Sequence, residues 1–314
     1  MSVYFLRGTA VALSEFVLIY FATWFAISYA WSLWPRSSDR ISRRSSNFLF
    51  ALQLTPFLGA LLAVVVLAVP AFVRFEPRGG EEDFGAPVIV LGALCLAVLS
   101  MGAWRSARAI LEMRRLARQW KGQSVSADDL AGLPVMKTSA DAPPLVVVGL
   151  IRPRLYVSSS ASATLNEQEL ARAIAHESAH VQRHDNLKKL ALRLCCLPFA
   201  GRLERQWLAS LEIAADMAAV RSQREALDLA SALVKASKLA GRSPDLSMTF
   251  TVEGSDLLKA RVERLLGWKP TSGHQTSRTL IYSAISVTAI TLLLSPWYSA
   301  MLLAVHEFSE VLVR

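Results

Sequence analysis

The sequence predicts a mostly α-helical membrane protein, with four transmembrane helices and a cytoplasmic α+β domain inserted between the third and the fourth. Composition is the first reason, since 53% of the 314 residues are hydrophobic and only 19% are charged, whereas soluble domains carry about 25% charge. The second reason is four apolar runs, each long enough to cross a bilayer, for which about 20 residues are needed. These runs cover residues 16–34, 48–73, 86–104 and 280–305.

The charges of the short loops predict how these helices are oriented. Residues 35–47 carry four arginines against one aspartate, whereas residues 74–85 carry two arginines against four acidic residues. Residues 105–121 carry six basic residues and one glutamate. Because basic loops stay on the cytoplasmic side, both termini are expected outside and the inserted domain inside. The basic surplus of the chain, net +9, is then a topology signal, and no nucleic-acid partner is expected.

The chain therefore divides into three regions. Residues 1–104 form the N-terminal membrane region, residues 105–278 the cytoplasmic domain, and residues 279–314 the fourth helix with a short external tail. A first span that begins at Phe16 leaves Glu15 at the membrane interface.

Local signals predict the elements of the inserted domain. These are a basic amphipathic helix over 105–121 resting on anionic lipid, a hairpin of strands 145–148 and 155–158, a long helix from about Glu167 that Pro198 and Gly201 end, and a second helix over 203–221. Thr164 and Glu167 have the spacing of a capping box at the start of the long helix.

The long helix contains the pattern H-E-x-x-H, formed by His176, Glu177 and His180. With 5 histidines in the chain, chance places this pattern in roughly 0.4% of such sequences. Positions i and i+4 of a helix share a face, so both imidazoles can bind one Zn²⁺ at about 2.0–2.1 Å. Glu177 lies about 100° further round the helix, where it can act as a general base on a water molecule. The pattern predicts a catalytic zinc site.

A catalytic zinc ion needs a third protein ligand. His184 continues the histidine row, but eight residues of straight helix put it about 12 Å from His176. The metzincin spacing also fails, because Arg183 stands at the glycine position and Asn186 at the third histidine. Three carboxylates of the second helix remain as candidates: Glu204, Glu212 and Asp216. Of a pair spaced i, i+4, one carboxylate can bind zinc while the other hydrogen-bonds a ligand histidine.

These motifs resemble the BlaR/MecR group of membrane zinc metallopeptidases, which are gluzincins with an H-E-x-x-H helix and a downstream Glu-x-x-x-Asp helix. The resemblance rests on residues 149–157, 165–180, 183–185 and 212–216, and on three apolar runs before the domain and one after it. It implies a gluzincin-like domain in which His176, His180 and Glu212 bind Zn²⁺ and Glu177 is the general base. It also implies that Asp216 orients a ligand histidine, with Arg183 and Asp185 as supporting residues.

The resemblance implies an integral membrane zinc-dependent endopeptidase that cleaves a protein substrate at the cytoplasmic face. A transcriptional repressor, another membrane protein or the protein itself could be that substrate. The antibiotic receptors carry an extracellular penicillin-binding sensor after the fourth span, whereas this sequence ends at Arg314. We therefore do not expect β-lactam sensing by this polypeptide, and a regulatory membrane partner stays open. Two alternatives remain: a membrane gluzincin of the prenyl-protein or stress-response type, and a non-catalytic zinc-binding signal transducer, against which the intact Glu177 counts.

Overall fold

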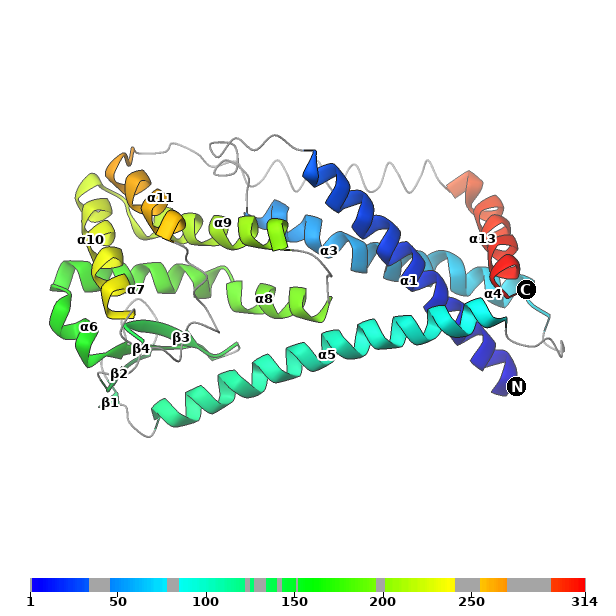
Figure 1. The fold of residues 1–314 in the computed structure, drawn as a ribbon, viewed down its shortest axis with the longest axis horizontal. Coiled ribbons are helices and arrows are strands. Elements are labelled where there is room, and N and C mark those ends of the chain that lie inside the picture. Colours follow the sequence, from blue (N-terminus) through cyan, green and yellow to red (C-terminus); the bar gives the residue numbers. More distant parts are fainter. Residues whose placement is uncertain are drawn as a thin grey trace.

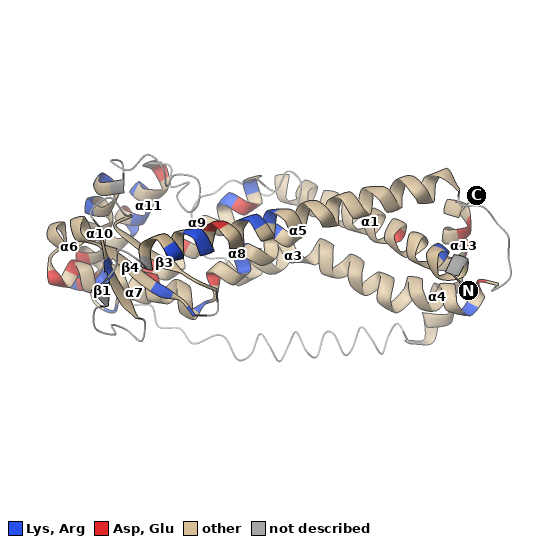
Figure 2. Ribbon diagram, turned by 90° about the horizontal axis from the view of Figure 1, so that it is seen from below, with Lys and Arg blue, Asp and Glu red and all other residues tan. Residues whose placement is uncertain are grey.

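The protein is elongated, with a bundle of long helices at one end and a small sheet surrounded by shorter helices at the other (Figure 1). The N- and C-termini both lie at the end opposite the sheet. Charged residues gather around the sheet and along the adjoining half of α5, while the bundle is mostly uncharged (Figure 2). The computed structural model describes residues 2–33, 46–77, 85–121, 125–126, 134–139, 143–150, 152–195, 201–240, 255–269 and 295–313.

Three of the described helices are long and apolar enough to cross a membrane. They are α1 (Ser2–Ser32), the continuous helix made of α3 (Ser46–Ala63), η1 (Val64–Ala68) and α4 (Val69–Phe75), and α5 (Ala86–Lys121). Most of the predicted fourth span, residues 280–294, lies outside the described residues. Its last part is the short 3₁₀ turn η3 (Ser295–Trp297) followed by α13 (Tyr298–Val313), which extends past residue 305.

The first helix begins at Ser2, well before Phe16, where the first apolar run begins. Its early charges have partners far away in the sequence. Arg7 forms a buried ion pair with Glu76, 2.8 Å apart. Glu15 is buried and accepts a hydrogen bond from Ser309 of α13, and therefore does not lie at an exposed interface. Paired charges are tolerated inside a helix bundle, which explains why the helix continues through them.

A proline explains the wide π-helical turn between α3 and α4. Pro70 has no backbone N–H and cannot bond the carbonyl four residues earlier, which belongs to Val66. The hydroxyl of Tyr298 donates to this Val66 carbonyl oxygen at 2.8 Å instead. The start of α13 is thereby attached to the continuous helix α3–η1–α4.

The sheet has four strands in the order β1-β2-β4-β3. They are β1 (Val125–Ser126), β2 (Val135–Thr138), β3 (Leu145–Val148) and β4 (Arg154–Ser158). Strands β3 and β4 form the predicted antiparallel hairpin, whereas β2 and β4 are parallel. Gly149 begins the turn of the hairpin with a φ of 120°, a conformation open to glycine. Strand β3 is at the edge of the sheet and contacts α7.

Helix α5 continues from the membrane into the domain, as predicted for residues 105–121. Part of its apolar side, however, packs on protein. Met113, Leu116 and Trp120 pack against Val148 and Tyr156 of the sheet. This helix therefore joins the membrane bundle rigidly to the sheet.

Six further helices belong to the described part of the domain. They are α6 (Ser159–Thr164), α7 (Glu167–Gln182), α8 (Asp185–Leu194), α9 (Gly201–Ala219), α10 (Gln223–Ala240) and α11 (Ser255–Leu266). The capping box of α7 is formed by Asn166 and Glu169, not by Thr164 and Glu167. Thr164 still belongs to α6, where its hydroxyl donates to the Ser160 carbonyl.

The long helix predicted up to Pro198 is interrupted at His184, which has a left-handed backbone conformation with φ 55°. Helix α7 therefore ends at Gln182, and α8 begins at Asp185. The interruption redirects the chain so that α8 packs along α5.

The domain and the membrane helices share apolar packing. Leu203, Trp207 and Leu211 of α9 form one buried cluster with Leu49 of α3. The Trp207 ring stacks on Phe50 with 6.0 Å between centroids. Helix α9 thus lies against α3, and the hydroxyl of Tyr20 in α1 also donates to the Cys195 carbonyl after α8 at 2.8 Å.

Candidate metal centre

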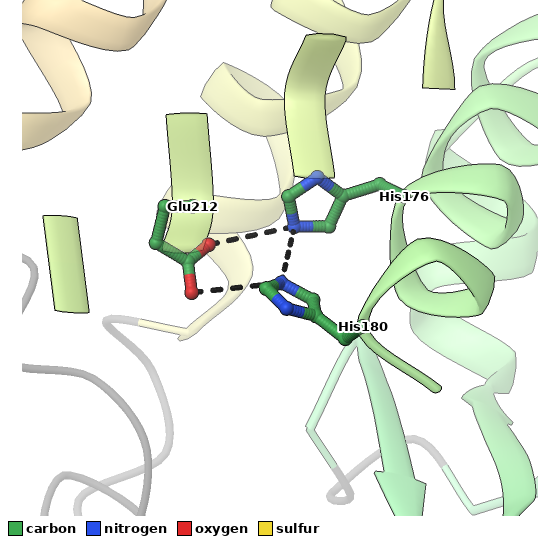
Figure 3. Close-up of side chains that lie close together, drawn as sticks. All are labelled: His176, His180 and Glu212. Carbon is green, nitrogen blue, oxygen red and sulfur yellow. Dashed lines mark hydrogen bonds and ion pairs between the residues drawn. The ribbon is translucent and has the colours of Figure 1, made fainter. Parts of the chain in front are cut away.

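Two packed helices, α7 and α9, bring the candidate ligands together. His176 and His180 are one turn apart on α7, as the i, i+4 spacing requires. Glu212 lies on α9 and points toward both imidazoles (Figure 3). Because α7 ends at Gln182, α9 can run back past it at the level of both histidines, which a helix continuing to Pro198 would have made difficult.

The distances between the donor atoms are close to those of a zinc site, with one oxygen of Glu212 turned to each histidine. The two Nε2 atoms of His176 and His180 are 3.2 Å apart. His176 Nε2 is 3.4 Å from Glu212 Oε2, and His180 Nε2 is 3.6 Å from Glu212 Oε1. Ligands bound at about 2.0–2.1 Å in tetrahedral geometry are about 3.4 Å apart. Two imidazoles and one carboxylate that converge in this way suit Zn²⁺.

The other ring nitrogen of each histidine faces an aspartate. His180 Nδ1 is 2.8 Å from Asp185 Oδ2. His176 Nδ1 is 3.0 Å from Asp216 Oδ1, at a hydrogen-bond distance though not at a hydrogen-bond angle. Carboxylates in these positions hold the proton on Nδ1 and leave the Nε2 lone pair for a metal. Asp216 and Asp185 are both almost fully buried.

Arg261 of α11 is a member of the centre that the sequence analysis missed. Its guanidinium group binds Asp216 through two atoms, Nε at 2.8 Å and Nη2 at 2.7 Å. Its Nη1 is 3.2 Å from Glu212 Oε2, so one buried cation serves both carboxylates of α9. One feature of the sequence could have revealed it. Arg261 shares a helix face with Leu258 and Leu265, at i, i+3, i+7 spacing, and is thus a charged residue within the apolar stripe of α11.

The carboxylates dominate the electrostatics of the centre. Burial alone would lower the pKa of His176, but Asp216 and Glu212 outweigh it and raise this pKa to about 10. Burial likewise opposes the charge of His180, but Asp185 and Glu212 raise its pKa. Burial raises the pKa of Glu212, but the two histidines bring it well below the ordinary value. A metal that binds here therefore displaces a proton.

Glu177 lies beside the ligands without belonging to them. Its side chain is half-buried, and within the described residues no hydrogen bond or ion pair reaches it. A carboxylate in this state is available to a water molecule or a substrate, as a general base requires.

The remaining candidates lie outside the cluster of donor atoms. Glu204 is exposed at the start of α9, and His184 is exposed between α7 and α8. Arg183 lies 3.9 Å from Asp185 and also donates to Ser46, the first residue of α3. It therefore lies between a membrane helix and the aspartate that faces His180.

The comparison with known families matches the chain to BlaR1 peptidase M56 over residues 87–265, more than half of its length. The chain belongs to the BlaR1 peptidase M56 family. The resemblance to BlaR/MecR proteins is thereby confirmed, and the prenyl-protein and stress-response types are disfavoured. No curated protein matches the chain.

The M56 region runs from α5 to α11 and includes all the residues of the centre, Arg261 among them. M56 peptidases are generally metallopeptidases, and the three apolar helices agree with a membrane protein of this family. Family membership thus indicates a membrane-associated metallopeptidase.

Proposed function

We propose that this M56 protein is an integral membrane zinc-dependent endopeptidase that hydrolyses peptide bonds of a protein substrate at the cytoplasmic face. One observation carries the proposal: His176, His180 and Glu212 bring ligand atoms within 4.8 Å of one another, beside Glu177, whose carboxylate pairs with no side chain in the described part of the chain. His176, His180 and Glu212 would be the zinc ligands, and Glu177 the general base.

Each residue has a defined task in this reaction. When bound, Zn²⁺ would supply Lewis acidity to the scissile carbonyl and to water, whose pKa such a site brings toward about 7. Glu177 accepts the proton of the attacking water and passes it to the leaving amine nitrogen. Asp185 and Asp216 keep the ligand imidazoles in the tautomer that leaves Nε2 free, and Arg261 neutralises the carboxylates of α9.

Strand β3 is the part of the fold best suited to hold an extended substrate. The Ser158 amide donates to the Pro144 carbonyl at 3.0 Å. In the antiparallel register of β3 and β4, this bond directs the N–H and C=O groups of Leu145 and Val147 away from β4. No described strand pairs with that edge. A peptide could add there as a further strand and be held through its main chain, which permits loose sequence preference.

The orientation and the regulation of the enzyme are part of the proposal. The basic residues of 35–47 and 105–121 support a cytoplasmic site with external termini. A membrane partner would supply the stimulus. The substrate would be a transcriptional repressor, another membrane protein or the protein itself.

The test compares two carboxamide substitutions in the full chain, purified in lipid. Glu177→Gln keeps the size and the zinc ligands but removes the proton acceptor. We expect unchanged zinc content and a fall of about 10²–10⁴ in the hydrolysis of an unfolded protein substrate. Glu204→Gln, which changes an exposed carboxylate of α9, is the matched control and should cleave normally.

Cleavage by a zinc-loaded Glu177→Gln protein at the normal rate would refute the mechanism. A zinc-loaded natural protein that cleaves no substrate, with or without a chelator, would favour the non-catalytic signal transducer.

A further inference from the structure

A second group of metal-binding side chains lies at the opposite end of the protein. Glu76 follows the last residue of α4, and His306 and Glu310 lie on α13. Each of the three offers a ligand atom within 4.8 Å of the other two. Figure 1 shows α13 beside α4 at the end that carries both termini, far from α7.

Local contacts hold these three side chains close to one another. His306 and Glu310 are spaced i, i+4 and share one face of α13, as the two histidines of α7 do. The His306 ring stacks on Phe75 with 5.4 Å between centroids. The bond from Tyr298 to the Val66 carbonyl attaches the first turn of the same helix to the same partner. The ligand atoms therefore face each other across a packed helix contact.

The far end of α13 is also held tightly. A Cβ atom on Gly85 would lie 2.1 Å from the Val313 carbonyl oxygen, so only glycine fits beside the last turn. Both ends of α13 are thus fixed, and His306 and Glu310 between them have little freedom to move away from Glu76.

Charge favours a cation at this place. Glu76 is buried, while His306 and Glu310 are half-buried. Arg7 pairs with Oε1 of Glu76, and because a carboxylate has about four lone-pair sites, pairing with a cation does not prevent it from binding a metal. Glu15, also buried, accepts from Ser309, the residue next to Glu310. Carboxylates gathered in apolar surroundings are costly without positive charge, and a divalent ion supplies it.

The donor set indicates the class of metal. One imidazole nitrogen with two carboxylate oxygens suits Zn²⁺ and other divalent transition metals. Ca²⁺ and Mg²⁺ prefer oxygen ligands alone and more of them. Three protein ligands also leave a coordination position for water.

We propose that Glu76, His306 and Glu310 bind a second divalent transition-metal ion, Zn²⁺ being the best match, and that this ion fastens α13 to α4. The site is independent of the proposed catalytic centre. By the charge pattern of the loops it would face the outside, where metal can reach it without crossing the membrane.

The experiment measures zinc by elemental analysis in the full chain, held in lipid nanodiscs and dialysed against a low zinc concentration. We expect about two zinc ions per chain. His306→Gln and Glu310→Gln should each reduce this to about one and should keep the proteolysis of the remaining site. Glu307→Gln, which changes an exposed carboxylate of the same helix, is the matched control and should retain both ions.

A second readout does not depend on zinc counting. Co²⁺ should produce ligand-field absorption from two sites in the natural protein and from one site in the His306→Gln variant. One ion per chain in the natural protein, or two ions in both His306→Gln and Glu310→Gln, would overturn the proposal. An ion that is lost from the His180→Ala variant belongs to the catalytic centre and not to this second site, so the two proposals can fail separately.

Discussion

Replacing Arg261 by methionine should be among the most destabilising single changes in the catalytic half of the protein. The substitution keeps an unbranched side chain but removes the guanidinium group that binds Asp216 through two atoms and approaches Glu212. Arg261 and Asp216 are only 2% and 3% exposed in this pair. Breaking a buried ion pair by removing one partner costs about 3–5 kcal/mol, because the other charge stays buried.

An exposed ion pair on the same helix α11 provides the control for the Arg261→Met substitution. Lys259 and Glu263 form an ion pair at 3.9 Å with side chains that are 76% and 65% exposed. Such a surface pair contributes about 0–1 kcal/mol. Lys259→Met therefore removes a cation from the same helix at little cost.

Urea unfolding of the full chain in detergent, followed by tryptophan fluorescence with a chelator present, measures both variants under metal-free conditions. Arg261→Met should unfold at a clearly lower urea concentration than Lys259→Met. A double variant with Asp216→Asn should lose less than the sum of the two single changes, since the charges act as a pair. The Arg261→Met variant should also bind zinc about 10–100-fold more weakly, because removing a residue that supports a metal ligand has an effect of this size. Equal stability of Arg261→Met and Lys259→Met would refute the reasoning.

Three further predictions concern the metal, pH and topology. Glu212→Ala should lose zinc at the catalytic centre together with proteolysis, whereas Glu204→Ala should change neither; tight binding in the first variant would reassign the ligand. Burial opposes the charge of Glu169, but hydrogen bonds from a lysine and a serine of α10 lower its pKa below the ordinary 4.5. Glu169→Gln should therefore destabilise the protein by about 1–3 kcal/mol at pH 7. This loss should fade as the pH falls through the lowered pKa. Unfolding curves of the variant that shift equally at pH 7 and pH 3 would contradict this. A reporter fused after Lys121 should be cytoplasmic and one at Gly80 external, and the reverse result would overturn the orientation.

Short-range spacing made much of the centre predictable. The i, i+4 histidines, Glu177 between them and the Glu-x-x-x-Asp spacing all depend on helical periodicity within a few residues. Spacing therefore predicted the two histidines and Glu177 but left three carboxylates open, among which the family resemblance implied Glu212, and the structure brings the donor atoms of His176, His180 and Glu212 together.

Features that depend on contacts between distant parts of the chain could not be predicted from the sequence. Arg261 lies 45 residues after Asp216 and belongs to no motif. The pairing of Arg7 with Glu76, 69 residues later, was equally invisible in the sequence. The left-handed conformation of His184 was also hidden, because glycine usually marks such a position.

The packing of α9 against the membrane helices has a practical consequence. A water-soluble fragment that begins after the third span would uncover Leu203, Trp207 and Leu211, which are at most 4% exposed in the whole protein. Each large apolar side chain left in water costs about 1.5–3 kcal/mol, a large share of the 5–15 kcal/mol that keeps a typical domain folded. Excision would also remove the support of the helix that carries Glu212. Biochemical work on this peptidase should therefore start from membranes and keep the transmembrane helices attached.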